Sequence, residues 1–129
     1  MRKLTYLFFI STIILTLTGC FKRDNFEDIT IYTTAYPIEF ITDKLYGEHS
    51  EIKSIYPDGT NIKTYNLNSK QIKDYSKGSL FVFNGIGKEE TYISKFVKHN
   101  KDLKIIDASQ SIEYTYDEEE LWLDPSNFL

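Results

Sequence analysis

The stretch Leu80-Phe81-Val82-Phe83 decides the fold that we expect for this chain of 129 residues. It is a continuous apolar run, with Gly78 shortly before it and Asn84-Gly85 directly after it. A strand inside a parallel sheet has this composition because helices cover both faces of the sheet. Residues 80–83 are therefore expected to form a buried parallel strand.

Strand and helix patterns alternate on both sides of this run. Further strands are expected at residues 29–33, 52–56 and 103–106, and helices at residues 37–47, 68–75 and 89–99. In the first helix, Ile38, Ile41 and Leu45 have helical spacing and are expected to form one apolar face. Strands that alternate with helices indicate βαβ units. The sequence thus predicts an α/β fold with a parallel sheet of about four strands flanked by helices.

The N-terminus has the layout of an export signal. Arg2 and Lys3 are followed by an apolar run over residues 4–17. This run is shorter than the ~20 residues that a membrane-spanning helix needs, so a cleaved signal is favoured over an uncleaved anchor. The segment Leu17-Thr18-Gly19-Cys20 resembles the bacterial lipobox. The resemblance implies that residues 1–19 are a signal peptide and that Cys20 carries fatty acyl chains such as palmitate. Residues 20–27 would then be a lipidated tether.

The composition argues against nucleic acid as a partner and against an intramolecular disulfide. Removal of residues 1–19 takes two of the 15 basic residues and none of the 19 acidic ones, which changes the net charge from −4 to −6. A nucleic-acid-binding protein needs a basic face, so this balance argues against nucleic acid as a partner. Cys20 is the single cysteine, so no intramolecular disulfide can form.

Neither of the two histidines lies in a sequence context that indicates a catalytic site. His49 lies in a polar loop, and His99 lies in the last turn of an expected helix, where its charge favours the helix dipole. Neither belongs to a nucleophile–histidine–acid motif. We therefore expect a protein that is not an enzyme.

Four segments resemble motifs of one family. They are residues 33–40, residues 57–59 together with 65–72, residues 80–89, and Trp122-Leu123-Asp124-Pro125. The third is similar to the family's A-D-L-F-V-Y-N-G-L-G-L-E strand and turn, and the fourth to its D-P-H-x-W-L-D-P segment. On these segments the chain resembles the solute-binding proteins of metal ABC transporters of the zinc and manganese type.

The resemblance implies a two-lobed fold like that of periplasmic binding proteins, with Zn2+ or Mn2+ held between the lobes as the transported ligand. Residues 28–121 would be the N-terminal lobe and residues 122–129 the start of the helix between lobes, with the C-terminal lobe absent. Permease and ATPase subunits would be the partners. The protein would be lipid-anchored at the extracellular face of the cell membrane.

Two expected ligand positions depart from the family. The resemblance implies that the first lobe supplies two histidine ligands. By motif register, Lys63 stands at the position of the first of these histidines and Glu120 at the position of the second. A protonated lysine has no lone pair to give to a metal, whereas a carboxylate is a suitable ligand for Mn2+.

Three hypotheses for the ligand follow from these departures. In the first, a metal is still bound by Glu120 and the second lobe, together with Asp58, Asp124 or one of residues 117–119. In the second, the Lys63 ammonium takes the place of the cation and pairs with Glu120, so that metal binding is lost. In the third, Lys63 contacts another ligand, either anionic or organic. A rival function is a surface lipoprotein for interaction or cell adhesion, or a truncated remnant.

Overall fold

A computed structural model of the chain describes residues 26–85 and 87–110. The expected signal peptide, Cys20, Glu120 and the expected start of the helix between lobes at residues 122–129 lie outside the described residues. The described part contains a four-stranded sheet in which every pair of neighbouring strands is parallel. The predicted α/β class is therefore confirmed.

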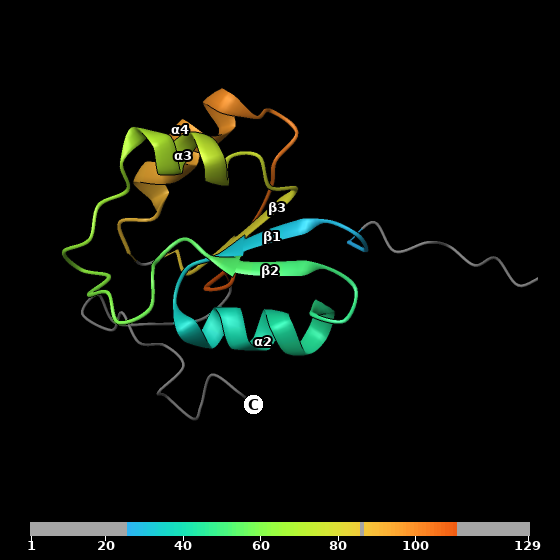
Figure 1. Ribbon diagram of the computed structural model, residues 1–129. Helices are drawn as coiled ribbons and strands as arrows, with labels where there is room; N and C mark the ends of the chain where they lie inside the picture. The colour runs from blue at the N-terminus through green and yellow to red at the C-terminus, as the bar shows by residue number, and fades with distance from the viewer. Residues whose placement is uncertain (1–25, 86, 111–129) are drawn as a thin grey trace, which may run out of the picture.

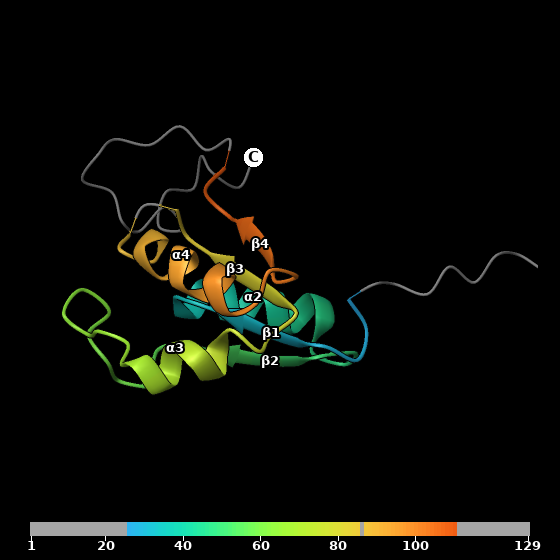
Figure 2. The ribbon, with the colours of Figure 1, turned by 90° about the horizontal axis from the view of Figure 1, so that it is seen from above.

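The helices and strands alternate along the chain. They are β1 (Thr30–Thr33), α2 (Tyr36–Tyr46), β2 (Glu51–Ser54), α3 (Ser69–Tyr75), β3 (Leu80–Phe83), α4 (Glu90–His99) and β4 (Lys104–Asp107). The strand order across the sheet is β2-β1-β3-β4. Helix α2 lies on one face of the sheet, and α3 and α4 lie side by side on the other (Figures 1 and 2).

The main core lies between the sheet and the α3–α4 layer. Phe81 on β3 is 1% exposed, and its ring meets the ring of Phe96 on α4 edge-on, with 5.2 Å between the ring centroids. Tyr92 and Ile72 bring the faces of α4 and α3 into the same cluster. This confirms the prediction that residues 80–83 form a buried parallel strand.

Helix α3 begins where the sequence places its start. The Asn68 side chain accepts a hydrogen bond from the backbone N–H of Gln71, and the Gln71 side chain accepts one from the backbone N–H of Asn68. This reciprocal pair is a capping box, which satisfies two donors at the helix start that have no partner within the helix. The predicted helix over residues 68–75 is confirmed.

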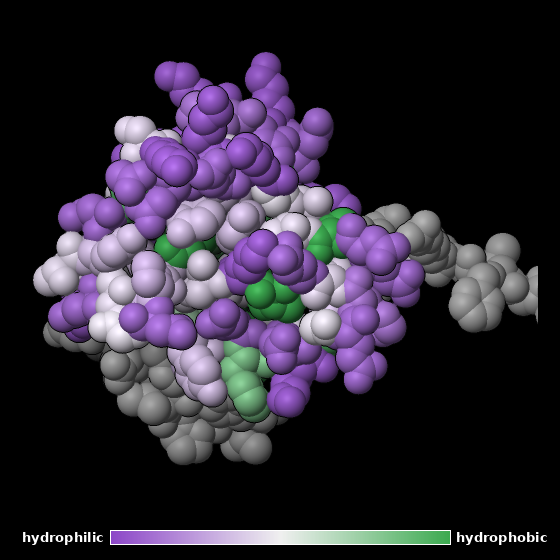
Figure 3. Space-filling model, viewed as in Figure 1, coloured by the Kyte–Doolittle hydropathy of each residue, from purple (hydrophilic) through white to green (hydrophobic). Residues whose placement is uncertain are grey.

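The apolar face predicted for α2 is only partly buried. The helix expected from the spacing is present, but only Ile38 of the apolar face is buried, since Ile41 is 48% and Leu45 is 68% exposed. The buried helix positions are Ile38 and Thr42, four residues apart, on a helix that contacts β2 and β1. In Figure 3, hydrophobic residues show as small separate patches near β2 and α2, and hydrophilic residues cover the surface over α3 and α4.

The second strand ends earlier than predicted. It closes at Ser54 instead of Tyr56, because the Ser54 hydroxyl donates to the Thr34 carbonyl and accepts the Tyr56 N–H. Ile55 and Tyr56 are nonetheless buried, beyond the end of the strand. This bend carries the chain from the sheet toward the pocket described below.

The described part starts with a residue that packs on the fold. Phe26, near the end of the expected tether, meets the Tyr46 ring edge-on at 5.8 Å between centroids, and the Lys104 ammonium lies 5.0 Å from its ring centroid. Across residues 26–85 and 87–110, no helix has both the length and the apolar character required to cross a membrane.

Candidate functional site

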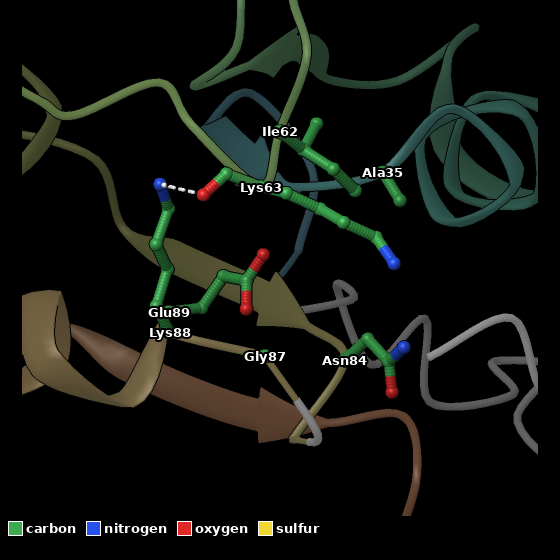
Figure 4. Close-up of a pocket in the computed structure, with 7 residues that line it drawn as sticks. All are labelled: Ala35, Ile62, Lys63, Asn84, Gly87, Lys88 and Glu89. Carbon is green, nitrogen blue, oxygen red and sulfur yellow. Dashed lines mark hydrogen bonds between the residues drawn. The ribbon is translucent and has the colours of Figure 1, made fainter. Parts of the chain in front are cut away.

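A pocket of about 140 Å³ lies where β1 and β3 end (Figure 4). Its lining residues come from the segment after β1, the loop after β2 and the turn after β3: Ala35, Ile62, Lys63, Asn84, Gly87, Lys88 and Glu89. In the strand order β2-β1-β3-β4, the chain passes from β1 to β2 on one side of β1. The later strands β3 and β4 lie on the other side of β1. The pocket therefore lies at the point where the strand order reverses, which is where open parallel sheets bind ligands.

The loop that carries Lys63 is fastened to the start of α4. The Lys88 ammonium donates to the backbone carbonyl of Lys63 at 3.1 Å and to that of Tyr65. The Lys63 backbone N–H donates to the Asn61 side chain at 3.0 Å. These bonds fix the backbone from which the exposed Lys63 side chain extends along the pocket (Figure 4).

Glu89 brings a buried carboxylate to the pocket. It is 6% exposed, and its Oε1 accepts a hydrogen bond from the Tyr56 hydroxyl at 3.1 Å. Burial, and then the negative charge of Glu89, raise the pKa of Tyr56 far above its ordinary value. The phenol therefore stays protonated and acts as a hydrogen-bond donor to the carboxylate.

The turn after β3 is shaped around two carboxylates. Asp107, at the end of β4, accepts the backbone N–H of Gly85 at 3.0 Å and the hydroxyl of Ser109 at 2.6 Å. A Cβ on Gly85 would lie 2.2 Å from the Asp107 Oδ2, and a Cβ on Gly87 would lie 2.0 Å from the Glu89 Oε2. Both glycines therefore leave room for a neighbouring acidic side chain.

A second pocket of about 200 Å³ adjoins the first and shares Ala35 and Ile62 with it. Tyr36, which is 73% exposed, and Asp58 are among its lining residues. The hydrogen bond between Tyr56, which lines this second pocket, and Glu89 of the first pocket joins the two walls. Together the two pockets form a hollow that follows the carboxyl ends of β2, β1 and β3.

The structure places some of the predicted site residues and not others. Lys63 lines the first pocket and Asp58 the second. Glu120, Asp124 and residues 117–119 lie outside the described residues, so the role of Glu120 stays a prediction. His49 and His99 are exposed and precede β2 and β4. They therefore lie toward the amino ends of the strands, whereas the pockets lie at the carboxyl ends. Across the described ranges, no three His, Cys, Asp or Glu side chains are grouped as a metal would require.

Glu89 and Lys88 were not predicted as site residues. Both belong to the motif over residues 80–89, and Glu89 was also expected to begin a helix, but neither was given a role at the ligand. One signal was available, because both residues directly follow the turn after a buried parallel strand, and ligand sites gather at that end of a strand.

The chain resembles known proteins in sequence and in fold. The manganese-binding lipoprotein MntA of Halalkalibacterium halodurans is 27% identical over 134 residues, which cover all of this chain and 44% of that protein. The fold is similar to that of the Zn(II)-bound ZnuA-like domain of Streptococcus pneumoniae AdcA, with a TM-score of 0.60, 22% identity, and coverage of 71% of this chain and 35% of that one. The solute-binding protein FpvC of Pseudomonas aeruginosa, in complex with Mn2+, has a TM-score of 0.61 at 19% identity, with 71% of this chain and 35% of that chain covered.

These proteins are all longer, so the chain spans less than half of the length of each relative named here. The family model described as zinc-uptake complex component A, periplasmic, matches residues 31–129, which include every described strand and helix except the first residue of β1. The chain therefore belongs to the family of zinc-uptake complex component A, the ZnuA family.

Proposed function

We propose that this chain is the N-terminal lobe of a lipid-anchored solute-binding protein that captures Zn2+ or Mn2+ outside the membrane for an ABC importer. Membership of the ZnuA family is the observation that carries the proposal. The protein would pass the metal to permease and ATPase subunits and would catalyse no reaction itself. Cys20 would hold it at the extracellular face of the cell membrane.

The pocket chemistry gives partial support to metal capture. The Glu89 carboxylate and the Asn84 side-chain carbonyl are oxygen donors of the kind that Mn2+ accepts. The described part would supply one side of the site, and Glu120 with a second lobe would supply the other. Closure of two lobes around a ligand is the usual mechanism of binding proteins.

Metal analysis of the full-length protein, with calorimetric titrations of Zn2+ and Mn2+, tests the proposal. Binding of either metal at micromolar or lower concentration, with no comparable heat from Mg2+, is the expected result. Mg2+ is the control because it keeps its water shell and prefers sites with several waters. Absence of binding to both Zn2+ and Mn2+ would refute the proposal.

Lys63 favours a second candidate, a surface lipoprotein for interaction or cell adhesion, or a remnant that no longer binds metal. An ammonium beside the pocket repels a divalent cation and can pair with a carboxylate instead. A permease gene and an ATPase gene next to this one would favour import. If neither gene is present and neither metal binds, the second candidate is favoured.

A further inference from the structure

The carboxylate of Glu89 is aimed into the first pocket. Glu89 immediately precedes α4, and its side chain extends from there toward the side chain of Lys63 on the opposite wall (Figure 4). Its residue is 6% exposed, whereas its neighbour Glu90, also acidic, is exposed at the surface of α4. Burial therefore separates the two adjacent glutamates into a pocket residue and a surface residue.

A hydrogen bond from Tyr56 and the space beside Gly87 help to position this carboxylate. The Tyr56 hydroxyl donates to Oε1 at 3.1 Å, from a residue 33 positions earlier in the chain. Gly87 leaves the space that Oε2 occupies, since an added Cβ would lie 2.0 Å away from it. The carboxylate is thus positioned from the loop after β2 and from the turn after β3, which are the two segments that form most of the pocket.

A buried carboxylate at a pocket wall attracts cations more strongly than one at the surface, because less water screens its charge. Carboxylate oxygen is a normal ligand of both Zn2+ and Mn2+. The Lys88 ammonium, although it is next in sequence, is bonded to the backbone carbonyls of Lys63 and Tyr65. It therefore stabilises the loop while Glu89 faces the pocket.

We infer that Glu89 is a cation-contacting residue of this pocket and supplies, from the turn after β3, the negative charge that Lys63 cannot supply. The inference rests on the proposed function and adds to it a residue that the family motifs at Lys63 and Glu120 do not indicate. The ligand class is a divalent cation that accepts oxygen ligands.

Calorimetry with Mn2+ and with Zn2+ on the full-length protein tests this inference. Glu89→Gln keeps the size of the side chain and an oxygen that can accept from Tyr56, but removes the charge. We expect it to weaken binding by roughly thirtyfold or more, which is the lower range for a lost partner of a buried charge. The matched control, Glu90→Gln, should leave the affinity within about twofold. Equal affinities for wild type and Glu89→Gln would overturn the inference and leave metal capture standing.

A second variant covers the case in which Glu89→Gln does not fold, as judged by circular dichroism. Glu89→Asp keeps the charge and withdraws it by one methylene group. It should weaken the binding of Mn2+ by roughly tenfold, the scale at which displaced coordination-shell groups change metal affinity. Unchanged affinity in Glu89→Asp would overturn the inference.

A further pair of variants decides the case in which the wild type binds neither metal, so that the proposed function fails. Lys63→His removes the ammonium and provides an imidazole opposite Glu89. If Glu89 contacts cations, Lys63→His gains Zn2+ binding, and the double variant with Glu89→Gln loses that gain. No gain in Lys63→His, or a gain that persists without Glu89, would overturn the inference.

Discussion

Replacement of Gly87 by alanine should destabilise the fold because it displaces the carboxylate of Glu89. The added Cβ would lie 2.0 Å from Glu89 Oε2, and Gly87 is not in the left-handed region, so its backbone can accept alanine without strain. The carboxylate must therefore move away. It would then lose the 3.1 Å hydrogen bond from Tyr56. A hydrogen bond to a charged group contributes about 1.5–3 kcal/mol, so we expect a loss of about 2 kcal/mol in the free energy of unfolding.

Urea unfolding followed by circular dichroism measures this loss. Tyr56→Phe removes the same hydrogen bond from the other side, so its effect and that of Gly87→Ala should overlap in the double variant. The combined loss should fall short of the sum by at least about 1 kcal/mol, as for residues in direct contact. Gly59→Ala is the control, because Gly59 has a φ of +71° and nothing within 4 Å of an added Cβ. Its cost of about 1–2 kcal/mol comes from the backbone and should add to that of Tyr56→Phe.

A loss below about 0.5 kcal/mol in Gly87→Ala, which is typical of a surface substitution, would refute this reasoning. Simple additivity of Gly87→Ala and Tyr56→Phe would also contradict it. In either case the Glu89 carboxylate would not be positioned by Tyr56 and Gly87 as described above.

Three further predictions concern Tyr56, Lys88 and Cys20. Because the pKa of Tyr56 is raised above its ordinary value of 10.0, the unfolded chain releases this proton first. The urea midpoint should therefore decrease as the pH rises above about 10, more steeply in wild type than in Tyr56→Phe; equal slopes would contradict this. Lys88→Met removes two bonds to the loop around Lys63. Its unfolding free energy should drop by about 1–3 kcal/mol and amide exchange over residues 61–66 should accelerate, with exposed Lys70→Met as the unchanged control. Cys20→Ser should move the protein from the membrane fraction into the medium, and retention in the membrane would argue against lipid anchoring.

The apolar runs and the helix starts made most of the fold predictable. Residues 80–83 could be assigned to a buried strand because an uninterrupted apolar run fits a strand covered on both faces. Asn68 could be assigned to a helix start because its side chain can bond to a backbone N–H within the first turn. Both inferences depend only on neighbours in sequence. The ends of β2 were less predictable, because Ser54 ends that strand through a bond to Thr34, on another segment.

The burial of α2 could not be predicted from its own sequence. Spacing marks Ile38, Ile41 and Leu45 as one side of a helix, but the line of contact with the sheet depends on which strands lie beneath it. That is set by the order β2-β1-β3-β4, which arises from long-range pairing.

The site was predictable in part. Motif register identified Lys63, which lines the first pocket. The burial of Glu89 depends on Tyr56, which precedes it by 33 positions, and no local pattern in the sequence reports such a contact. Whether Glu120 approaches this pocket stays a prediction.

The strand register has a consequence for how the pocket forms during folding. Thr30 pairs with Glu51 and Leu80 with Lys104, over similar short spans, whereas Ile31 pairs with Leu80 over about twice the span. Shorter loops close at a lower entropic cost, so the β1-α2-β2 and β3-α4-β4 units are favoured to assemble before they join. Ala35 belongs to the first unit and Glu89 to the second. The first pocket takes its lining from both units, so it forms only when the β1–β3 seam closes, and any fluctuation that opens this seam removes it.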